Sequence, residues 1–161
     1  MYKLIACDLD ETLLADNKQI TLDNQQAIKA AVARGVHFVP NTGRSFLTVQ
    51  HNLKQLGLLQ QKNEFVISYN GGAIVENYQN RVLQTQPMPF EVVKQLFELG
   101  ISQGCCVHVY TLDRLYIWNI NAAEISYITG RVNNWSECQR PTMDFLKSAE
   151  LMKIIFLLPV E

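Results

Sequence analysis

The sequence has no excess of charge of either sign. Its 161 residues include 14 lysines and arginines against 15 aspartates and glutamates, which gives a formal net charge of −1 and a pI near 6.3. Proteins that bind nucleic acid or acidic membranes through electrostatics carry a clear basic patch or a basic excess. We therefore expect a small-molecule ligand, with no nucleic acid and no membrane among the partners.

Long apolar runs and paired cysteines are also lacking. No apolar segment approaches the roughly 20 residues needed to cross a bilayer, and no basic region followed by a long apolar run begins the chain. The four cysteines include no C-x-x-C pair, and the three histidines (His37, His51 and His108) show no metal-ligand spacing. Such cysteines are typical of buried thiols in a reducing compartment, so we expect a cytoplasmic protein.

A hydrophobic content of 48% is sufficient for one ordinary packed domain or two small ones. The first apolar run, residues 4–7, has the length of a buried strand, and Asp8 and Asp10 follow it. If the backbone stays extended for two more residues, these carboxylates share one face. At the carboxyl end of a parallel strand they would border a ligand-binding crevice. The alternative is that they cap a helix or solvate a turn.

The segment that contains these acids resembles a known motif. Residues 8–14 read Asp-Leu-Asp-Glu-Thr-Leu-Leu, which is similar to the first motif, D-x-D-x-T, of the haloacid dehalogenase (HAD) superfamily of phosphohydrolases. The string looks like that of the Cof-type branch, where Glu at the position of Glu11 is an accepted variant. The resemblance implies that Asp8 is the nucleophile and that Asp10 is the general acid and base.

The next residues predict a strand, a helix and a second strand. Thr21 suits the N-cap of a helix over residues 22–34, and the apolar residues 36–39 form a short strand that we expect Pro40 to end. Strands joined by such a helix pair in parallel, almost always through a right-handed crossover. The segment after the second strand would then lie at the same edge of the sheet as Asp8.

That segment contains Thr42, Gly43 and Arg44 and precedes a helix predicted over residues 45–56. A hydroxyl, a glycine and an arginine before a helix N-terminus suit an anion; the alternative is a helix cap with a solvated arginine. Thr42 resembles the second HAD motif, and Thr-Gly-Arg is the form found in the Cof-type branch. The resemblance implies that Thr42, Gly43 and Arg44 bind phosphate and that Thr12 braces the first loop.

A third strand is predicted over residues 65–68, and Asn70 and Gly71 follow it. Asn-Gly between apolar runs favours a hairpin turn into residues 73–75. Cof-type sequences carry a similar string at the mouth of the substrate site. This resemblance makes Asn70 and Gly71 further substrate-binding candidates, in addition to their role in a turn.

Pro87 and Pro89 punctuate the chain, and we place a domain boundary between residues 1–86 and 87–161. The second part is expected to contain a helix, an antiparallel hairpin, another helix, an irregular stretch up to residue 148 and a final strand over residues 152–158. This order resembles the α+β cap of Cof-type enzymes. The expected fold class is α/β, a HAD-like Rossmannoid parallel sheet with a Cof-type cap, both of them partial.

The resemblance also implies a cofactor and a substrate. Mg²⁺ would be held by Asp8 and by Asp10, the latter through its backbone carbonyl, and a small phosphorylated metabolite such as a sugar phosphate would be hydrolysed through an aspartyl-phosphate. HAD phosphatases carry two later motifs, a phosphate-binding lysine and Gly-Asp-x-x-Asn-Asp, and no Gly-Asp dipeptide occurs in this sequence. We therefore expect the N-terminal portion of a phosphatase, with weak or no turnover by itself.

Two alternatives remain. A phosphotransfer receiver domain also forms an aspartyl-phosphate, but its acceptor follows the third strand, where this chain has Asn70. A truncated HAD-like binding or interaction module without catalysis is the other. Its missing core strands would leave a sheet edge open, and such an edge invites self-association.

Overall fold

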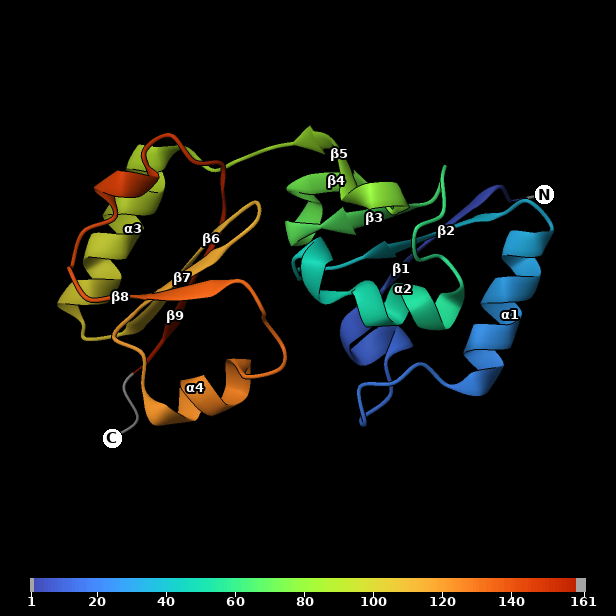
Figure 1. Cartoon of the computed structure of the whole chain (residues 1–161), viewed down its shortest axis with the longest axis horizontal. Helices are drawn as coiled ribbons and strands as arrows, with labels where there is room; N and C mark the ends of the chain where they lie inside the picture. Colours follow the sequence, from blue (N-terminus) through green and yellow to red (C-terminus); the bar gives the residue numbers. More distant parts are fainter. Residues whose placement is uncertain (1, 159–161) are drawn as a thin grey trace. The chain divides into compact units, whose positions relative to one another are not determined.

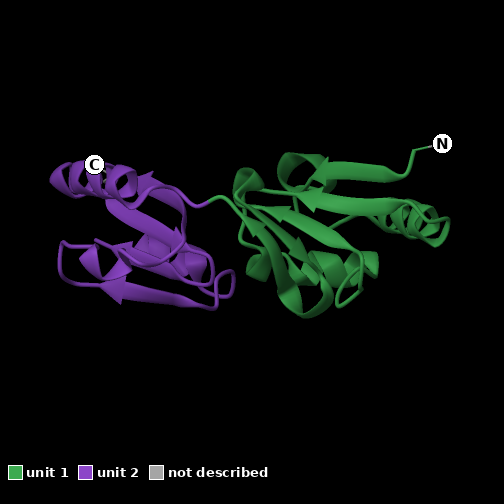
Figure 2. Cartoon of the chain, turned by 90° about the horizontal axis from the view of Figure 1, so that it is seen from above, with its two compact units in different colours: residues 1–86 green, residues 87–161 purple. Residues whose placement is uncertain are grey.

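The computed structural model describes residues 2–158, and the chain divides into two compact units, residues 1–86 and 87–161 (Figure 2). The connection contains Pro87 and Pro89. Proline has a fixed φ and no backbone N–H, so neither residue can continue a helix interior or a central strand. Each unit has a β-sheet of its own.

Unit 1 is built on a five-stranded sheet with the strand order β1-β2-β3-β4-β5 (Figure 1). The first three strands are parallel, and β3, β4 and β5 form an antiparallel meander. The α/β class is as predicted, but the sheet is mixed rather than parallel throughout. The strands are β1 (Leu4–Asp8), β2 (His37–Asn41), β3 (Phe65–Ser68), β4 (Ala73–Glu76) and β5 (Arg81–Thr85).

Strand β1 lies at the edge of this sheet, so the expectation of a buried strand is wrong. In the described part of the chain it pairs with β2 alone, and Leu4 and Ile5 remain 55% and 42% exposed. The apolar run does form a strand, but its burial depends on neighbours that other segments must provide. The outer edge of β1 carries backbone groups with which a further strand could pair.

Strand β2 continues through Pro40 instead of ending before it. Pro40 lies opposite Cys7 of β1, and Asn41 lies opposite both Asp8 of β1 and Ile67 of β3. Proline is tolerated here because the register between β2 and β3 is confined to Asn41 and Ile67, so no ladder bond to β3 requires an N–H at residue 40.

The α-helices of unit 1 are α1 (Leu22–Ala33) and α2 (Gln50–Leu56). As predicted, Thr21 caps α1, since its Oγ1 accepts a 3.3 Å hydrogen bond from the backbone N–H of Asn24. The single helix expected over residues 45–56 is not present. A 3₁₀ turn (Phe46–Thr48) precedes α2 instead.

The break before α2 has a local cause in two side chains. Thr48 Oγ1 donates a 2.8 Å hydrogen bond to the carbonyl of Ser45. Gln50 Nε2 donates a 2.7 Å bond to the carbonyl of Phe46. Side-chain bonds of this kind compete with the backbone bonds of an α-helix, so the helix begins one turn later than the apolar spacing predicts.

Unit 2 contains a four-stranded sheet with the order β8-β7-β6-β9, in which only β7 and β8 pair in parallel. The predicted hairpin is formed by β6 and β7. Strand β8 lies within the stretch expected to be irregular, because its four residues contain no apolar run. The elements are α3 (Phe90–Ser102), β6 (Cys106–Thr111), β7 (Leu115–Trp118), α4 (Ala122–Ile128), β8 (Trp135–Cys138) and β9 (Leu151–Leu157).

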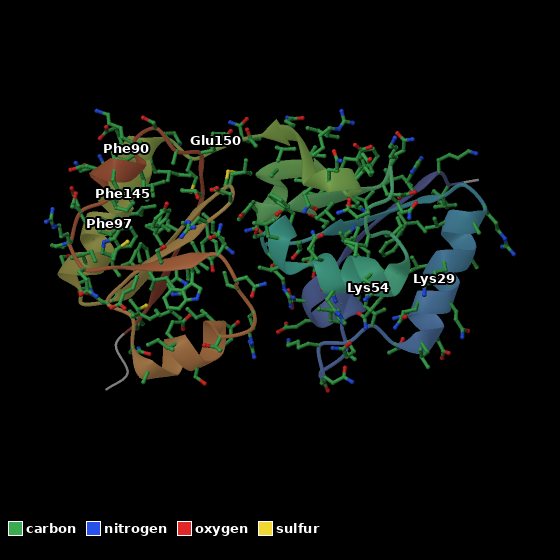
Figure 3. The ribbon with its side chains drawn as sticks, in the orientation of Figure 1. Lys29, Lys54, Phe90, Phe97, Phe145 and Glu150 are labelled. Atoms are coloured by element: carbon green, nitrogen blue, oxygen red, sulfur yellow. The ribbon has the colours of Figure 1, made fainter. Side chains whose placement is uncertain are left out.

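Helices α3 and α4 cover opposite faces of the sheet of unit 2. Val107 of β6 packs in the cluster beneath α3, whereas Cys106 packs with Ile128 of α4, because successive strand residues point to opposite faces. Trp118 is 1% exposed, and its ring lies edge-on to that of Phe97 with the centroids 4.8 Å apart. Phe97 extends from α3 (Figure 3). Among residues 2–158, no helix is long and apolar enough to cross a membrane.

Candidate functional site

The ends of the three parallel strands border one cavity. Its volume is about 420 Å³, and it lies at the carboxyl ends of β1, β2 and β3. These strands end level because Asp8 lies opposite Asn41, and Asn41 lies opposite Ile67. The cavity is lined by five residues predicted for the site and by two others: Asp8, Thr42, Gly43, Asn70 and Gly71, with Asn41 and Ile67.

The sequence did not single out the two additional lining residues, Asn41 and Ile67. A signal for Asn41 exists, since a polar residue at the end of a parallel strand is as suggestive of a ligand site as Asp8 is. Ile67 offers no such signal, because an apolar residue in a strand is the ordinary case.

Asp8 is braced by the turn that follows it. Thr12 Oγ1 donates a 3.2 Å hydrogen bond to Asp8 Oδ2, so the structure brings together the proposed nucleophile and the residue expected to brace its loop. The turn (Leu9–Leu13) is anchored by its two leucines, since Leu9 and Leu13 are buried. Its polar side chains are left at the surface beside the strand end.

Asp10 does not share the environment of Asp8. Strand β1 ends at Asp8, so the extended backbone that a shared face requires does not continue to Asp10. Arg44 Nε donates a 2.7 Å hydrogen bond to Asp10 Oδ2, and Arg44 Nη2 donates a second to Oδ1. The described residues that line the cavity include neither Asp10 nor Arg44. Arg44, expected at the phosphate, contacts Asp10 instead.

The helix N-terminus expected beside Thr42 is absent, because the chain enters the 3₁₀ turn there. Ser45 caps this turn, with its Oγ accepting a 3.2 Å bond from the N–H of Leu47. An anion in the cavity would therefore meet individual donors rather than an α-helix dipole. Thr42 Oγ1 accepts a 3.1 Å bond from the N–H of Arg44, and a hydroxyl that accepts a bond keeps its own proton for donation.

The loop after β3 folds against the loop after β2. Tyr69, Asn70 and Gly71 all have positive φ, at 54°, 57° and 92°, and asparagine and glycine tolerate this conformation best. The N–H of Asn70 donates a 3.1 Å bond to the carbonyl of Thr42. A Cβ on Gly43 would lie 2.7 Å from Asn70 Oδ1. The missing side chain of Gly43 therefore makes room for the Asn70 amide at the cavity.

Magnesium fits this site in part. Mg²⁺ prefers oxygen ligands and is usually held by one or two carboxylates together with waters and substrate phosphate, and Asp8 offers one carboxylate at the cavity. The carboxylate of Asp10 is paired with Arg44, and its backbone carbonyl is a magnesium ligand that the resemblance alone implies. Within residues 2–158, no group of three or more His, Cys, Asp or Glu side chains could hold a metal ion.

Cys7, next to Asp8, is not a competing nucleophile. Burial, and secondarily the adjacent Asp8 carboxylate, raise the pKa of the Cys7 thiol. The thiol therefore stays protonated near neutral pH, and only the thiolate is strongly nucleophilic. All four cysteines are free thiols. Cys105 and Cys106 are buried, as expected, whereas Cys7 and Cys138 are half-buried.

Comparison with known proteins places these features in a family. A sequence model of the haloacid dehalogenase-like hydrolases matches residues 5–161. The chain is 34% identical over 133 residues to the putative phosphatase YxeH of Bacillus subtilis, a match that covers 80% of this chain and 49% of the relative. It is 30% identical over 155 residues to a putative phosphatase of Streptococcus pyogenes serotype M6, covering 96% of this chain and 57% of the relative. The chain spans about half the length of these relatives.

Solved structures share the fold. The HAD subclass IIB sugar phosphatase BT4131 matches with a TM-score of 0.76 at 18% identity, over 96% of this chain and 57% of that one. A haloacid dehalogenase-like hydrolase from B. subtilis matches with a TM-score of 0.72 at 22% identity, over 96% and 59%. Together with the family match, these results leave no support for a receiver domain. The chain belongs to the haloacid dehalogenase-like hydrolase family, as the motif at residues 8–14 predicted.

Proposed function

We propose that this chain is the nucleophile-bearing part of a Mg²⁺-dependent phosphatase that hydrolyses small phosphorylated metabolites, such as sugar phosphates, through an aspartyl-phosphate. The observation that supports this most is the cavity at the strand ends, where Asp8 lies with Thr42 and Asn70. A carboxylate nucleophile and nearby hydrogen-bond donors are what a phosphoryl group requires. The phosphatase names of the relatives point to the same chemistry.

The reaction proceeds in two displacements at phosphorus. In the first, an Oδ atom of Asp8 forms a bond to phosphorus while the bond to the ester oxygen breaks, and the leaving oxygen takes a proton from Asp10. In the second, Asp10 takes a proton from water, whose oxygen binds phosphorus and releases Asp8. The sum is ester plus water giving alcohol plus inorganic phosphate.

Charge is the obstacle to the first displacement. Two unit negative charges about 4 Å apart repel by roughly 4 kcal/mol at an effective dielectric of about 20. Bound Mg²⁺, held by the Asp8 carboxylate and the Asp10 backbone carbonyl, would supply positive charge that offsets this repulsion. The Thr42 hydroxyl and the Asn70 amide would donate hydrogen bonds to the phosphoryl oxygens.

We assign residues 1–86 to a partial catalytic core and residues 87–161 to a partial cap. The chain covers 49% and 57% of two phosphatase relatives, and it contains no Gly-Asp dipeptide from which the last motif could be built. Lys94, in the proposed cap, is paired with Asp144 at 2.8 Å. We therefore expect weak or no turnover from this chain alone. Its four free thiols support a cytoplasmic location.

A second candidate function is a non-catalytic binding or interaction module. It is favoured by the open edge of β1, where Leu4 and Ile5 are exposed beside backbone groups able to pair with another strand. Size-exclusion chromatography with light scattering tests this directly. A dimer that dissociates on dilution supports self-association through this edge, and a monomer at all concentrations argues against it.

Hydrolysis of p-nitrophenyl phosphate with Mg²⁺ tests the phosphatase proposal. We expect slow turnover that Asp8→Asn removes, because an amide cannot act as the nucleophile. Asp16→Asn is the matched control, since Asp16 is an exposed turn residue outside the site. Measurable turnover that is equal in the wild type and in Asp8→Asn would contradict the proposal. Fast turnover that depends on Asp8 would support the nucleophile but contradict the expected weakness of the chain.

A further inference from the structure

We propose that Arg44 is a positioning residue that fixes the carboxylate of Asp10 beside the cavity. This inference rests on the proposed function, in which Asp10 moves protons. Arg44 contacts both carboxylate oxygens of Asp10, which lies 34 positions earlier in the chain. The pair therefore joins the turn after β1, which directly follows Asp8, to the loop after β2, which contains Thr42.

The backbone of Arg44 is itself held in place from two strands. Its N–H donates a 3.1 Å hydrogen bond to Thr42 Oγ1, at the end of β2. Its carbonyl accepts a 2.7 Å bond from Ser68 Oγ and a 3.1 Å bond from the N–H of Tyr69, at the end of β3. Ser68 is fully buried, so this anchor belongs to the packed sheet. The guanidinium thus extends from a fixed point.

The form of the ion pair indicates a geometric role. Two parallel bonds from a planar guanidinium fix the plane of a carboxylate as well as its position, which a lysine cannot do. The two side chains are 33% and 40% exposed, and pairs exposed to this degree add little to stability. Asp10 lies in the turn, beyond the last residue of β1. Arg44 therefore supplies the orientation that strand pairing does not.

The alternative role for Arg44 is direct binding of the phosphoryl group. The structure favours positioning, because Arg44 uses both Nε and Nη2 on Asp10 and is not among the described residues that line the cavity. The two roles make different predictions. A residue that acts through Asp10 loses its effect when Asp10 is removed, whereas a residue that binds phosphate keeps its effect.

A double-mutant cycle on p-nitrophenyl phosphate hydrolysis with Mg²⁺ separates these roles. We expect Arg44→Gln to lower kcat by about 10²-fold with little change in KM, because the proton-transferring group is misplaced. Arg44→Lys should restore only part of the loss. Asp10→Asn lowers kcat by about 10²-fold or more, and adding Arg44→Gln to it changes kcat by less than about 2-fold. Losses that multiply in the double variant would overturn the inference. Arg34→Gln, an exposed arginine at the end of α1, is the charge-matched control.

Binding of inorganic phosphate with Mg²⁺, measured by calorimetry, gives a readout that needs no turnover. We expect Arg44→Gln to keep the phosphate Kd within about 3-fold of the wild type, whereas Thr42→Val, which removes a donor from the cavity, weakens binding by about 10-fold. Equal weakening by both variants would assign Arg44 to the anion and overturn the inference. Absence of phosphate binding in the wild type would count against the proposed function instead, whereas absence of turnover alone would not, because weak or no turnover is expected of this chain.

The ion pair itself can be followed by NMR through the side-chain Nε–Hε resonance of Arg44. In the wild type we expect this proton to be protected from exchange with water by its bond to Asp10 Oδ2, and we expect the protection to be lost in Asp10→Asn. Asp16→Asn should leave it unchanged. An Arg44 resonance that does not respond to Asp10→Asn would overturn the inference whatever the outcome of the activity and binding assays.

Discussion

Strands β1 and β6 have similarly apolar sequences and opposite environments. Leu4 and Ile5 of β1 are more than 40% exposed, whereas Cys106 and Val107 of β6 are at most 3% exposed. The difference lies in their neighbours. Strand β6 has a strand on each side and a helix on each face, and β1 has a single paired strand in the described part of the chain. An apolar run thus predicts a strand, while topology decides its burial.

The two units also differ in where they place ionisable groups. Unit 1 keeps Asp8 exposed at the end of β1, where it lines the cavity, and holds Asp10 half-buried against Arg44. Unit 2 buries His108 and Glu124 between β6 and α4, with His108 Nε2 and Glu124 Oε1 3.4 Å apart. Unit 1 therefore offers a carboxylate to a ligand in the cavity, whereas the burial of ionisable groups in unit 2 makes the stability of that unit depend on pH.

The largest expected effect tests the contrast between β1 and β6 directly. Val107→Asp places a charge in the core beneath α3, and we expect it to cost more than about 4 kcal/mol of unfolding free energy and to unfold unit 2. Leu4→Asp, the matched change on β1, should cost less than about 1 kcal/mol. Both tryptophans, Trp118 and Trp135, lie in unit 2, so urea unfolding followed by tryptophan fluorescence reports unit 2, and far-UV circular dichroism adds unit 1.

A large cost for Leu4→Asp would break this comparison. It would mean that β1 is covered in solution by another chain or segment. Light scattering of the same samples would then show whether a second copy covers it.

The next effect is the pH dependence of unit 2. Burial, and secondarily the charge of Lys153, lower the pKa of His108 to about 4 from 6.5. As pH falls from about 6.5 to about 4, His108 is protonated in the unfolded state but stays neutral in the folded state. The unfolding free energy of unit 2 therefore falls by roughly 3 kcal/mol over that range. Denaturant midpoints measured by tryptophan fluorescence at several pH values check this.

Other ionisable groups near His108 also affect how the stability of unit 2 depends on pH. Burial raises the pKa of Glu124 above its usual 4.5. Its contribution to stability has the opposite sign to that of His108, because the unfolding free energy falls as pH rises from 4.5 through the raised pKa of the folded state. Burial lowers the pKa of Lys153 and raises that of Cys106 to about 11, so Cys106 titrates far above this range. His108→Leu should remove the acid-side loss, and His51→Leu on α2 should not.

A smaller effect concerns the contact of α3 with its sheet. A Cβ on Gly100 would lie 2.6 Å from the ring of Phe156 and 2.9 Å from a methyl carbon of Val107. Gly100→Ala improves helix propensity by about 1 kcal/mol, but overpacking costs about 1–3 kcal/mol, so we expect a net loss of stability in unit 2. Phe156→Leu in the same chain should recover part of it. A Gly100→Ala variant more stable than the wild type would show that the Phe156 and Val107 side chains can move aside at little energetic cost.

The smallest effects come from the helix caps, one in each unit. Thr21 Oγ1 accepts a 3.3 Å bond at the start of α1, and Asn121 Oδ1 accepts a 2.8 Å bond from the N–H of Glu124 at the start of α4. Thr21→Ala and Asn121→Ala should each cost about 1 kcal/mol. Only the second should shift the unfolding curve seen by tryptophan fluorescence. A shift caused by Thr21→Ala would mean that the units unfold together.

Several helices and strands could be predicted from signals in the local sequence. Thr21 caps α1 as its side chain predicts, Gly57 ends α2 at a φ of 74°, and strand β3 covers the predicted residues 65–68. These features depend on contacts within a few residues. The prediction of one helix over residues 45–56 was wrong because Thr48 and Gln50 bind backbone carbonyls that the helix would use, a choice that spacing of apolar residues cannot show.

The candidate site could likewise be predicted from the sequence only in part. The order of strands and the residues that follow them were enough to bring Asp8, Thr42 and Asn70 to one edge of a sheet. The partner of Arg44 was not predictable, because it depends on where β1 ends and on bonds from Ser68 and Tyr69 that fix the loop of Arg44. The likeness of Gly43 to a phosphate-loop glycine also gave no hint that the Asn70 side chain fills the space beside it.

By itself, the sequence determined most of the strands, the polar residues at their ends and the family of the chain, because these follow from short-range pattern and residue type. Only the tertiary structure decided that β1 is exposed, that Asp10 is held by Arg44 and that His108 is buried with Glu124. Each of these depends on which segments distant in sequence become neighbours. Desolvation and ion pairing act between such neighbours, and no single stretch of the chain specifies them.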